Sequence, residues 1–274
     1  MRTLAAALLL PALALMAGER TETRTEAFKP GATLSVRSAN GSVKVTPWDK
    51  DAVEIRADIK EREDHTVKVE VRHSGDSLEV EAILPSRSGG WSWGGGSDGV
   101  SFTLQVPRRL VGRFTSSNGR IELRGLEGNQ ELSTSNGTVK VEDVKGDVQA
   151  RTSNGSVLVR NLEGRLKGGS SNGGLTLEKI TGGIEFATSN AGIVADDLDG
   201  RGQGIDLSTS NGSIKVGLGS AKGEIDARTS NGSVHVDRSG VELVETGKSW
   251  ARLRVPGSSQ VIRLRSSNGS IHLR

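Results

Sequence analysis

The chain has 274 residues, a formal net charge of +3 at pH 7, and neither cysteine nor tyrosine. The absence of cysteine excludes a disulfide framework and a thiolate metal site, so burial and backbone pairing must hold the fold together. Aromatic residues make up 3% of the chain and charges of both signs are interspersed, which argues against nucleic-acid binding.

Residues 1–18, MRTLAAALLLPALALMAG, have the layout of a secretory signal peptide. An early arginine precedes an unbroken apolar run that ends in small residues. The run is shorter than the roughly 20 apolar residues that a membrane span needs, so we expect no transmembrane segment in the mature chain. We therefore expect an exported protein of the periplasm or cell surface, with its signal either cleaved or retained as an anchor.

Residues 19–110 are expected to form a first coil and an N-terminal cap. Asn40 and the glycine after it are an early copy of a motif that later repeats. In residues 53–84, longer alternating runs of apolar and polar residues are separated by EREDH and HSGDS. This pattern predicts β-hairpins that branch from the first coil.

A glycine-rich loop then carries Trp91 and Trp93, two of the four tryptophans in the chain. Exposed aromatic side chains can stack on sugars or dock a partner. The pair is thus a candidate contact for a ligand or partner. In the competing interpretation, both rings fold back over an open end of the core.

Residues 111–274 are expected to hold the regular repeats and a C-terminal cap. Asn-Gly, or Asn-Ala in one unit, recurs first every 18 residues and then with insertions, at Asn118, Asn136, Asn154, Asn172, Asn190, Asn211, Asn231 and Asn268. A second glycine column keeps the same step, so each unit has two turns and two strands. Apolar and polar residues alternate around each asparagine, which predicts half-buried β-strands.

A unit of two short strands cannot bury its apolar face alone, which favours a stacked array. We predict an all-β fold, a single-stranded β-solenoid with 18-residue coils and two strands per coil. Equivalent residues would lie ~4.8 Å apart in columns. Asn-Gly would supply a positive-φ corner, and the serine before it would form a hydroxyl and amide ladder. The alternative is an antiparallel β-meander with Asn-Gly in hairpin turns, which would separate equivalent residues by ~9.6 Å.

An export signal, a Val-Pro element ahead of the first regular turn and reiterated TSNG-S-V-x-V units resemble the bacterial "putative adhesin" family of domains of unknown function. The resemblance covers roughly residues 30–274. It implies a β-helix or β-solenoid with a cell-envelope or surface role. It also implies no known enzyme activity and offers no catalytic motif to transfer.

Short motifs suggest chemistry, but none has the context that the chemistry requires. GWSWG around Ser92 fits the nucleophile-elbow pattern without the flanking strand and helix. Asp196, Asp197 and Asp199 resemble a calcium-binding repeat in one unit only, and a solvated acidic turn is the simpler interpretation. The four histidines lie far apart in sequence, so we expect no metal site and no cofactor.

We therefore expect a non-enzymatic, adhesin-like β-solenoid that binds an envelope glycan or an envelope protein. One alternative is a carbohydrate-active β-helix enzyme, which would need clustered outward carboxylates. Another is an accessory protein in envelope-stress signalling. The outward-facing residues at equivalent positions of successive units differ in charge, as in Glu131, Gln149 and Lys167. This mixture favours a solvated face over a catalytic groove.

Overall fold

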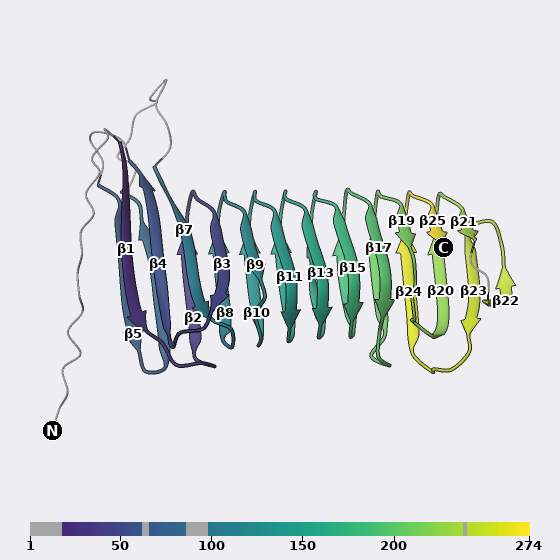
Figure 1. Cartoon of the computed structure of the whole chain (residues 1–274). Coiled ribbons are helices and arrows are strands. Elements are labelled where there is room, and N and C mark those ends of the chain that lie inside the picture. The colour runs from purple at the N-terminus through teal and green to yellow at the C-terminus, as the bar shows by residue number, and fades with distance from the viewer. Residues whose placement is uncertain (1–17, 62–65, 86–97, 238–239) are drawn as a thin grey trace, which may run out of the picture.

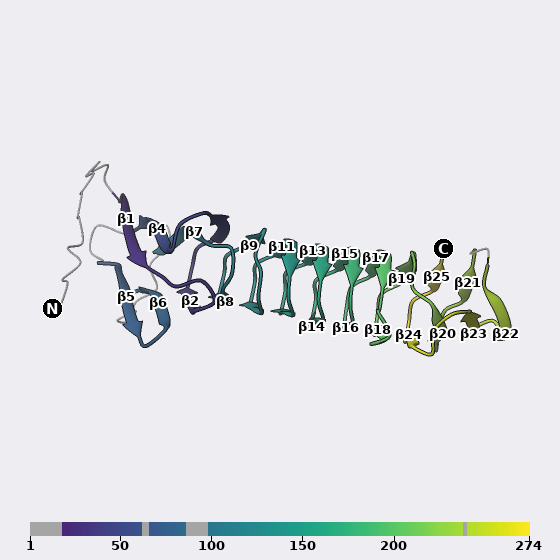
Figure 2. The ribbon, with the colours of Figure 1, turned by 60° about the horizontal axis from the view of Figure 1, so that its bottom comes forward.

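The computed structural model describes residues 18–61, 66–85, 98–237 and 240–274. These residues form two long β-sheets that face each other along a rod, and no helix occurs among them (Figure 1). The coils follow one another along the rod, and the view in Figure 2 shows the two sheets as its opposite faces.

Within the described residues the sheets contain 12 and 13 strands. The first sheet has the spatial order β1 (Glu19–Ala27), β4 (Ala52–Lys60), β7 (Gly99–Pro107), β3 (Val43–Trp48), β9 (Ile121–Arg124), β11 (Val139–Lys145), β13 (Val157–Glu163), β15 (Leu175–Thr181), β17 (Ile193–Asp199), β19 (Ile214–Val216), β25 (Ile271–Leu273) and β21 (Val234–Val236). The second has the order β22 (Glu242–Thr246), β23 (Trp250–Val255), β20 (Gly223–Thr229), β24 (Val261–Ser266), β18 (Ile205–Thr209), β16 (Ile184–Thr188), β14 (Leu166–Ser170), β12 (Val148–Thr152), β10 (Gln130–Thr134), β8 (Val111–Ser116), β2 (Thr33–Ser38), β6 (Ser77–Ile83) and β5 (Lys68–Ser74).

Successive coils pair through parallel strands. β10 pairs with β12 so that Gln130 lies opposite Val148, and β11 pairs with β13 so that Val139 lies opposite Val157. Partners in the regular coils are 18 residues apart, as the side-chain bond from Gln149 to Glu131 also shows. The predicted all-β solenoid is therefore confirmed, and the antiparallel meander is wrong for these coils.

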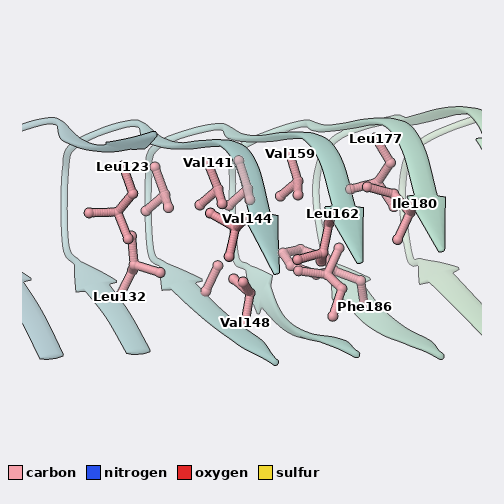
Figure 3. Packing of buried hydrophobic residues seen from close by; sticks show 14 of the residues in the cluster. Leu123, Leu132, Val141, Val144, Val148, Val159, Leu162, Leu177, Ile180 and Phe186 are labelled. Carbon is pink, nitrogen blue, oxygen red and sulfur yellow. The ribbon is translucent and has the colours of Figure 1, made fainter. Parts of the chain in front are cut away.

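The core is a set of aliphatic columns between the sheets. Figure 3 shows Leu123, Val141, Val159 and Leu177 in a row, one from each successive coil, and all four are at most 1% exposed. Each such side chain stabilises the folded state by about 1.5–3 kcal/mol relative to full exposure. Because every coil contributes to the same columns, burial continues along the whole array.

The strands of the first sheet bend at one residue in each regular coil. In β13 this residue is Asn161, whose φ is 51° and which has no partner in the register with β15. Its equivalents in the left-handed region are Asp143, Lys179 and Asp197. The bend turns both Val159 and Leu162 into the core, which explains why the alternation of apolar residues breaks at this point.

The glycine that follows each asparagine of the column except Asn190 serves close packing. A Cβ on Gly155 would lie 1.7 Å from the carbonyl oxygen of Gly137 in the preceding coil, and φ of Gly155 is outside the left-handed region. Positive φ occurs instead in the second glycine column, at Gly128, Gly146, Gly164 and Gly182. The predicted positive-φ corner at Asn-Gly is therefore wrong, because stacked backbones, and not a left-handed turn, exclude the side chain.

The last coil in the sequence is not the last coil in space. β24 lies between β18 and β20, and β25 lies between β19 and β21. The coil of Asn268 is thus inserted between those of Asn211 and Asn231, and the C-terminus lies short of the end of the rod (Figure 1). The order of the repeats in the sequence does not predict this insertion.

At the N-terminal end the pairing becomes antiparallel. β4 pairs with β1 and β7, and β5 pairs with β6. These strands lie beside the first coil, which β2 and β3 form and which contains Asn40.

Candidate functional site

Asparagine side chains form a hydrogen-bonded ladder along one edge of the rod. Nδ2 of Asn154 donates to Oδ1 of Asn136 at 2.7 Å, and Oδ1 of Asn154 accepts from Nδ2 of Asn172 at 2.7 Å. The same bond joins, in spatial order, Asn40, Asn118, Asn136, Asn154, Asn172, Asn190, Asn211, Asn268 and Asn231. The inserted last coil completes this ladder, because Asn268 bridges Asn211 and Asn231.

In six of the coils the hydroxyl that completes the turn comes from the residue two before the asparagine. Oγ1 of Thr152 donates to the carbonyl of Gly137 at 3.1 Å and accepts from the N–H of Gly155 at 3.1 Å. Ser153, directly before Asn154, is exposed and joins the ladder through its backbone N–H. The predicted hydroxyl ladder of these serines is therefore wrong, and their hydroxyls face solvent.

Replacement of Asn154 by alanine is expected to lower the free energy of unfolding by about 1–3 kcal/mol, because two hydrogen bonds worth about 0.5–1.5 kcal/mol each are lost. Asn231, at the end of the ladder, makes one such bond, at 2.8 Å to Asn268. The change Asn231→Ala should therefore cost about half as much. Urea unfolding followed by circular dichroism measures both, and equal effects would contradict this account.

A shallow groove lies beside the ladder on the outer face of the second sheet and encloses about 590 Å³. Its floor contains the small side chains of Ala187 and Ser208, which are neighbours in the register of β16 and β18. Arg265 of β24 and Arg228 of β20 follow on the next two strands. Exposed serines line the side next to the ladder, namely Ser189, Ser210, Ser267 and Ser230. We call this the arginine–serine groove.

The two arginines of the groove differ in their partners. Nε of Arg228 donates to Oδ1 of Asp226 at 2.6 Å. Arg265 forms no ion pair with any residue that the structure describes. Trp250, 37% exposed, lies opposite Arg228 in the register of β23 and β20. The groove thus combines an uncompensated guanidinium and several hydroxyls, and an aromatic ring lies beside it on the next strand.

Two like charges directly opposite in a sheet destabilise it. Arg265 and Arg228 are such a pair, and one carboxylate, Asp226, compensates them only in part. An anion between the guanidiniums would remove the repulsion, and guanidinium groups bind carboxylate or phosphate oxygens in a two-pronged geometry. The arrangement is therefore suited to an anionic ligand.

Lys140, in the outward column of the first sheet, is a compensated charge. Nζ of Lys140 lies 2.9 Å from a carboxylate oxygen of Glu142 and 3.1 Å from one of Glu122. Hydrogen bonds to Glu142 and Glu122 raise the pKa of Lys140 above its ordinary value. Lys140 therefore has no free charge to offer a ligand, in contrast to Arg265.

The structure locates only some of the residues that the sequence singled out. Trp91, Trp93 and Ser92 lie outside the described residues, as do residues 1–17 of the expected signal.

Asp196 and Asp199 have partners from the protein itself. Asp196 forms an ion pair at 2.6 Å with Arg274, and Oδ1 of Asp199 accepts from the N–H of Arg201 at 3.0 Å. These contacts agree with an acidic turn. Among the described residues no group of three or more His, Cys, Asp or Glu side chains could hold a metal ion.

His235 and His272, distant in sequence, stack with ring centroids 4.8 Å apart because the last coil is inserted beside β21. The same insertion brings Arg265 beside Arg228. Nothing in the local sequence of either unit signals these contacts. In the part of the chain that the structure describes, we find no helix with the length and apolarity to span a membrane.

Residues 32–274 match the Toastrack DUF4097 family, and no curated protein matches the chain. Two solved structures are similar. One is a "putative cell adhesion protein" from Clostridium sporogenes, with 12% identity, coverage of 93% of this chain and 99% of that chain, and a TM-score of 0.27. The other is a "putative adhesin" from Bacteroides fragilis, with 12% identity, coverage of 93% and 97%, and a TM-score of 0.35. Because the family match extends from the first coil to the last, the chain belongs to the Toastrack DUF4097 family, and the resemblance inferred from its repeats is confirmed.

Proposed function

We propose that the protein is a non-enzymatic, exported, adhesin-like β-solenoid that binds an anionic component of the cell envelope in the arginine–serine groove. The observation that carries the proposal is Arg265, a guanidinium without an ion-pair partner among the described residues, at the wall of a groove lined with serine hydroxyls. The ligand class is a glycan that bears carboxylate or phosphate groups. Its envelope location follows from the export signal expected at residues 1–18.

Each part of the groove supports this class. The guanidinium of Arg265 supplies charge and two parallel donors for a carboxylate or phosphate. The exposed serines can donate to and accept from sugar hydroxyls. Beside the groove, Trp250 on β23 offers a ring face on which a sugar can stack. The serines repeat from coil to coil at ~4.8 Å, so an extended polymer can follow them along the rod.

Replacing Arg265 by glutamine is expected to weaken binding to an anionic glycan about 10-fold or more, because a charge-assisted hydrogen bond contributes about 1.5–3 kcal/mol. The measurement is retention of residues 19–274 on isolated cell-wall and membrane fractions, and on immobilised polyuronate and dextran. Retention should fall with added salt, since screening weakens exposed ionic contacts. Dextran, which is neutral, should retain little protein.

Arg120→Gln is the matched control, because Arg120 is also exposed and forms no ion pair among the described residues, but lies outside the groove. It should bind like the unaltered protein. Failure to be retained on any fraction, or equal retention of both variants, would overturn the proposed site. Release of reducing ends from the bound glycan would instead identify an enzyme.

A further inference from the structure

The chain contains Asn-Gly eight times, and this dipeptide is chemically fragile. The backbone nitrogen after an asparagine can attack the side-chain amide carbon, most readily when the next residue is glycine. We propose that the ladder protects these asparagines from deamidation in the folded protein, and that Asn231, at the open end of the ladder, is the site where deamidation begins.

The reaction sets clear structural requirements. The N–H of the glycine loses its proton, its nitrogen bonds to Cγ of the asparagine, and the side-chain nitrogen leaves as ammonia. Water then opens the resulting succinimide at either carbonyl, which gives aspartate or isoaspartate. The glycine N–H must therefore be free of a hydrogen bond, and the side-chain amide must be able to turn towards it.

Interior coils meet neither requirement. The N–H of Gly155 donates to Oγ1 of Thr152 at 3.1 Å, and the amide of Asn154 is held by Asn136 and Asn172, both at 2.7 Å. The same bond from the glycine N–H to a hydroxyl occurs at Gly119, Gly137, Gly173, Gly212 and Gly269.

The two ends of the ladder differ. At the N-terminal end both side-chain atoms of Asn40 are held, because Nδ2 donates to the carbonyl of Asp98 at 3.0 Å and Oδ1 accepts from Asn118. At the other end Nδ2 of Asn231 donates to Asn268 at 2.8 Å. Within the described residues nothing donates to Oδ1 of Asn231, and the N–H of Gly232 has no acceptor. Asn231 is also exposed, which gives water access.

The test is peptide mapping of the folded protein during incubation at mildly alkaline pH. Trypsin releases residues 229–238, which contain Asn231, and residues 152–160, which contain Asn154. We expect isoaspartate to accumulate in the first peptide several-fold faster than in the second. In urea, where the ladder is absent, the two peptides should react at similar rates.

Two threonine variants separate the ladder from the bond to the glycine N–H. Thr152→Val removes the hydroxyl that holds Gly155 with little change in volume, but leaves the amide of Asn154 held by Asn136 and Asn172, so Asn154 should still deamidate more slowly than Asn231. Thr188→Val makes the same change in the coil of Asn190, where alanine follows the asparagine, and should add little. Circular dichroism establishes that both variants are folded.

Three results would overturn the proposal. The first is equal rates for the two peptides in the folded protein. The second is a stable Asn231 under conditions in which the unfolded chain reacts. The third is deamidation of Asn154 in folded Thr152→Val as fast as that of Asn231, since the ladder would then protect nothing.

Discussion

Replacing Gly155 with alanine is expected to lower the free energy of unfolding by about 1–3 kcal/mol, the range for overpacking a close-packed site. Ala191, in the coil of Asn190, is the one residue of this column in the regular coils that is not glycine. The added Cβ would lie 1.7 Å from the carbonyl oxygen and 2.4 Å from the carbonyl carbon of Gly137, where real Cβ contacts essentially never fall below 3.0 Å. Both atoms belong to backbone, so no side chain can turn aside. The backbone of the turn must shift to make room, which weakens the contacts between the coils at this turn.

Gly174→Ala is the control for this prediction. Gly174 lies in the next coil, its φ is outside the left-handed region, and a Cβ there would be 3.5 Å from its nearest neighbour, the carbonyl oxygen of Gly192. Alanine should fit and stabilise the fold by about 0.4–1 kcal/mol, since it restricts the unfolded chain. Urea unfolding of both variants measures the difference. Similar unfolding midpoints would contradict the account in which close approach, and not turn flexibility, requires glycine at this column.

The period of the sequence predicts the architecture because stacking converts a repeat length into a strand register. The 18-residue step of the asparagines reappears as the pairing of Gln130 with Val148. The position of a residue along the strand also predicts the side to which it points, because alternate residues face the same way. Thr152 therefore points inward, like Val148 and Ala150. The hydroxyl of Thr152 is accordingly the one that closes the turn, whereas Ser153 points outward.

Other features have no local signal. Asn-Gly suits both a left-handed turn and a close backbone contact, and only the packing between coils decides between them. The arginine–serine groove depends on the order of coils in space. Arg228 and Arg265 come from different units that became neighbours through the insertion of β24, and near-identical repeats do not reveal which units adjoin.

A chain that ends at residue 257, and so lacks β24 and β25, is expected to lose ordered structure at the C-terminal end of the rod. β24 pairs with both β18 and β20, and β25 pairs with both β19 and β21. Deletion would leave these neighbours about two strand spacings apart, roughly 9.6 Å. It would also remove four side chains that are at most 1% exposed, Ile262, Leu264, Ile271 and Leu273. At about 1.5–3 kcal/mol each, their burial contributes on the order of 6–12 kcal/mol.

Hydrogen exchange should locate the damage. Solenoid coils are stabilised chiefly by their nearest neighbours, so protection should fall in residues 223–255 and persist in the coils of Asn136 and Asn154. A chain that ends at residue 273 is the control, because it loses the exposed ion pair of Arg274 with Asp196, worth about 0–1 kcal/mol, and keeps the inserted coil. Undiminished protection of residues 223–255 in the shorter chain would mean that β20 restacks directly on β18, where Ile225 can take the column position of Ile262. The inserted coil would then be dispensable for the fold. Its main structural effect in the full chain would be to place Arg265 next to Arg228.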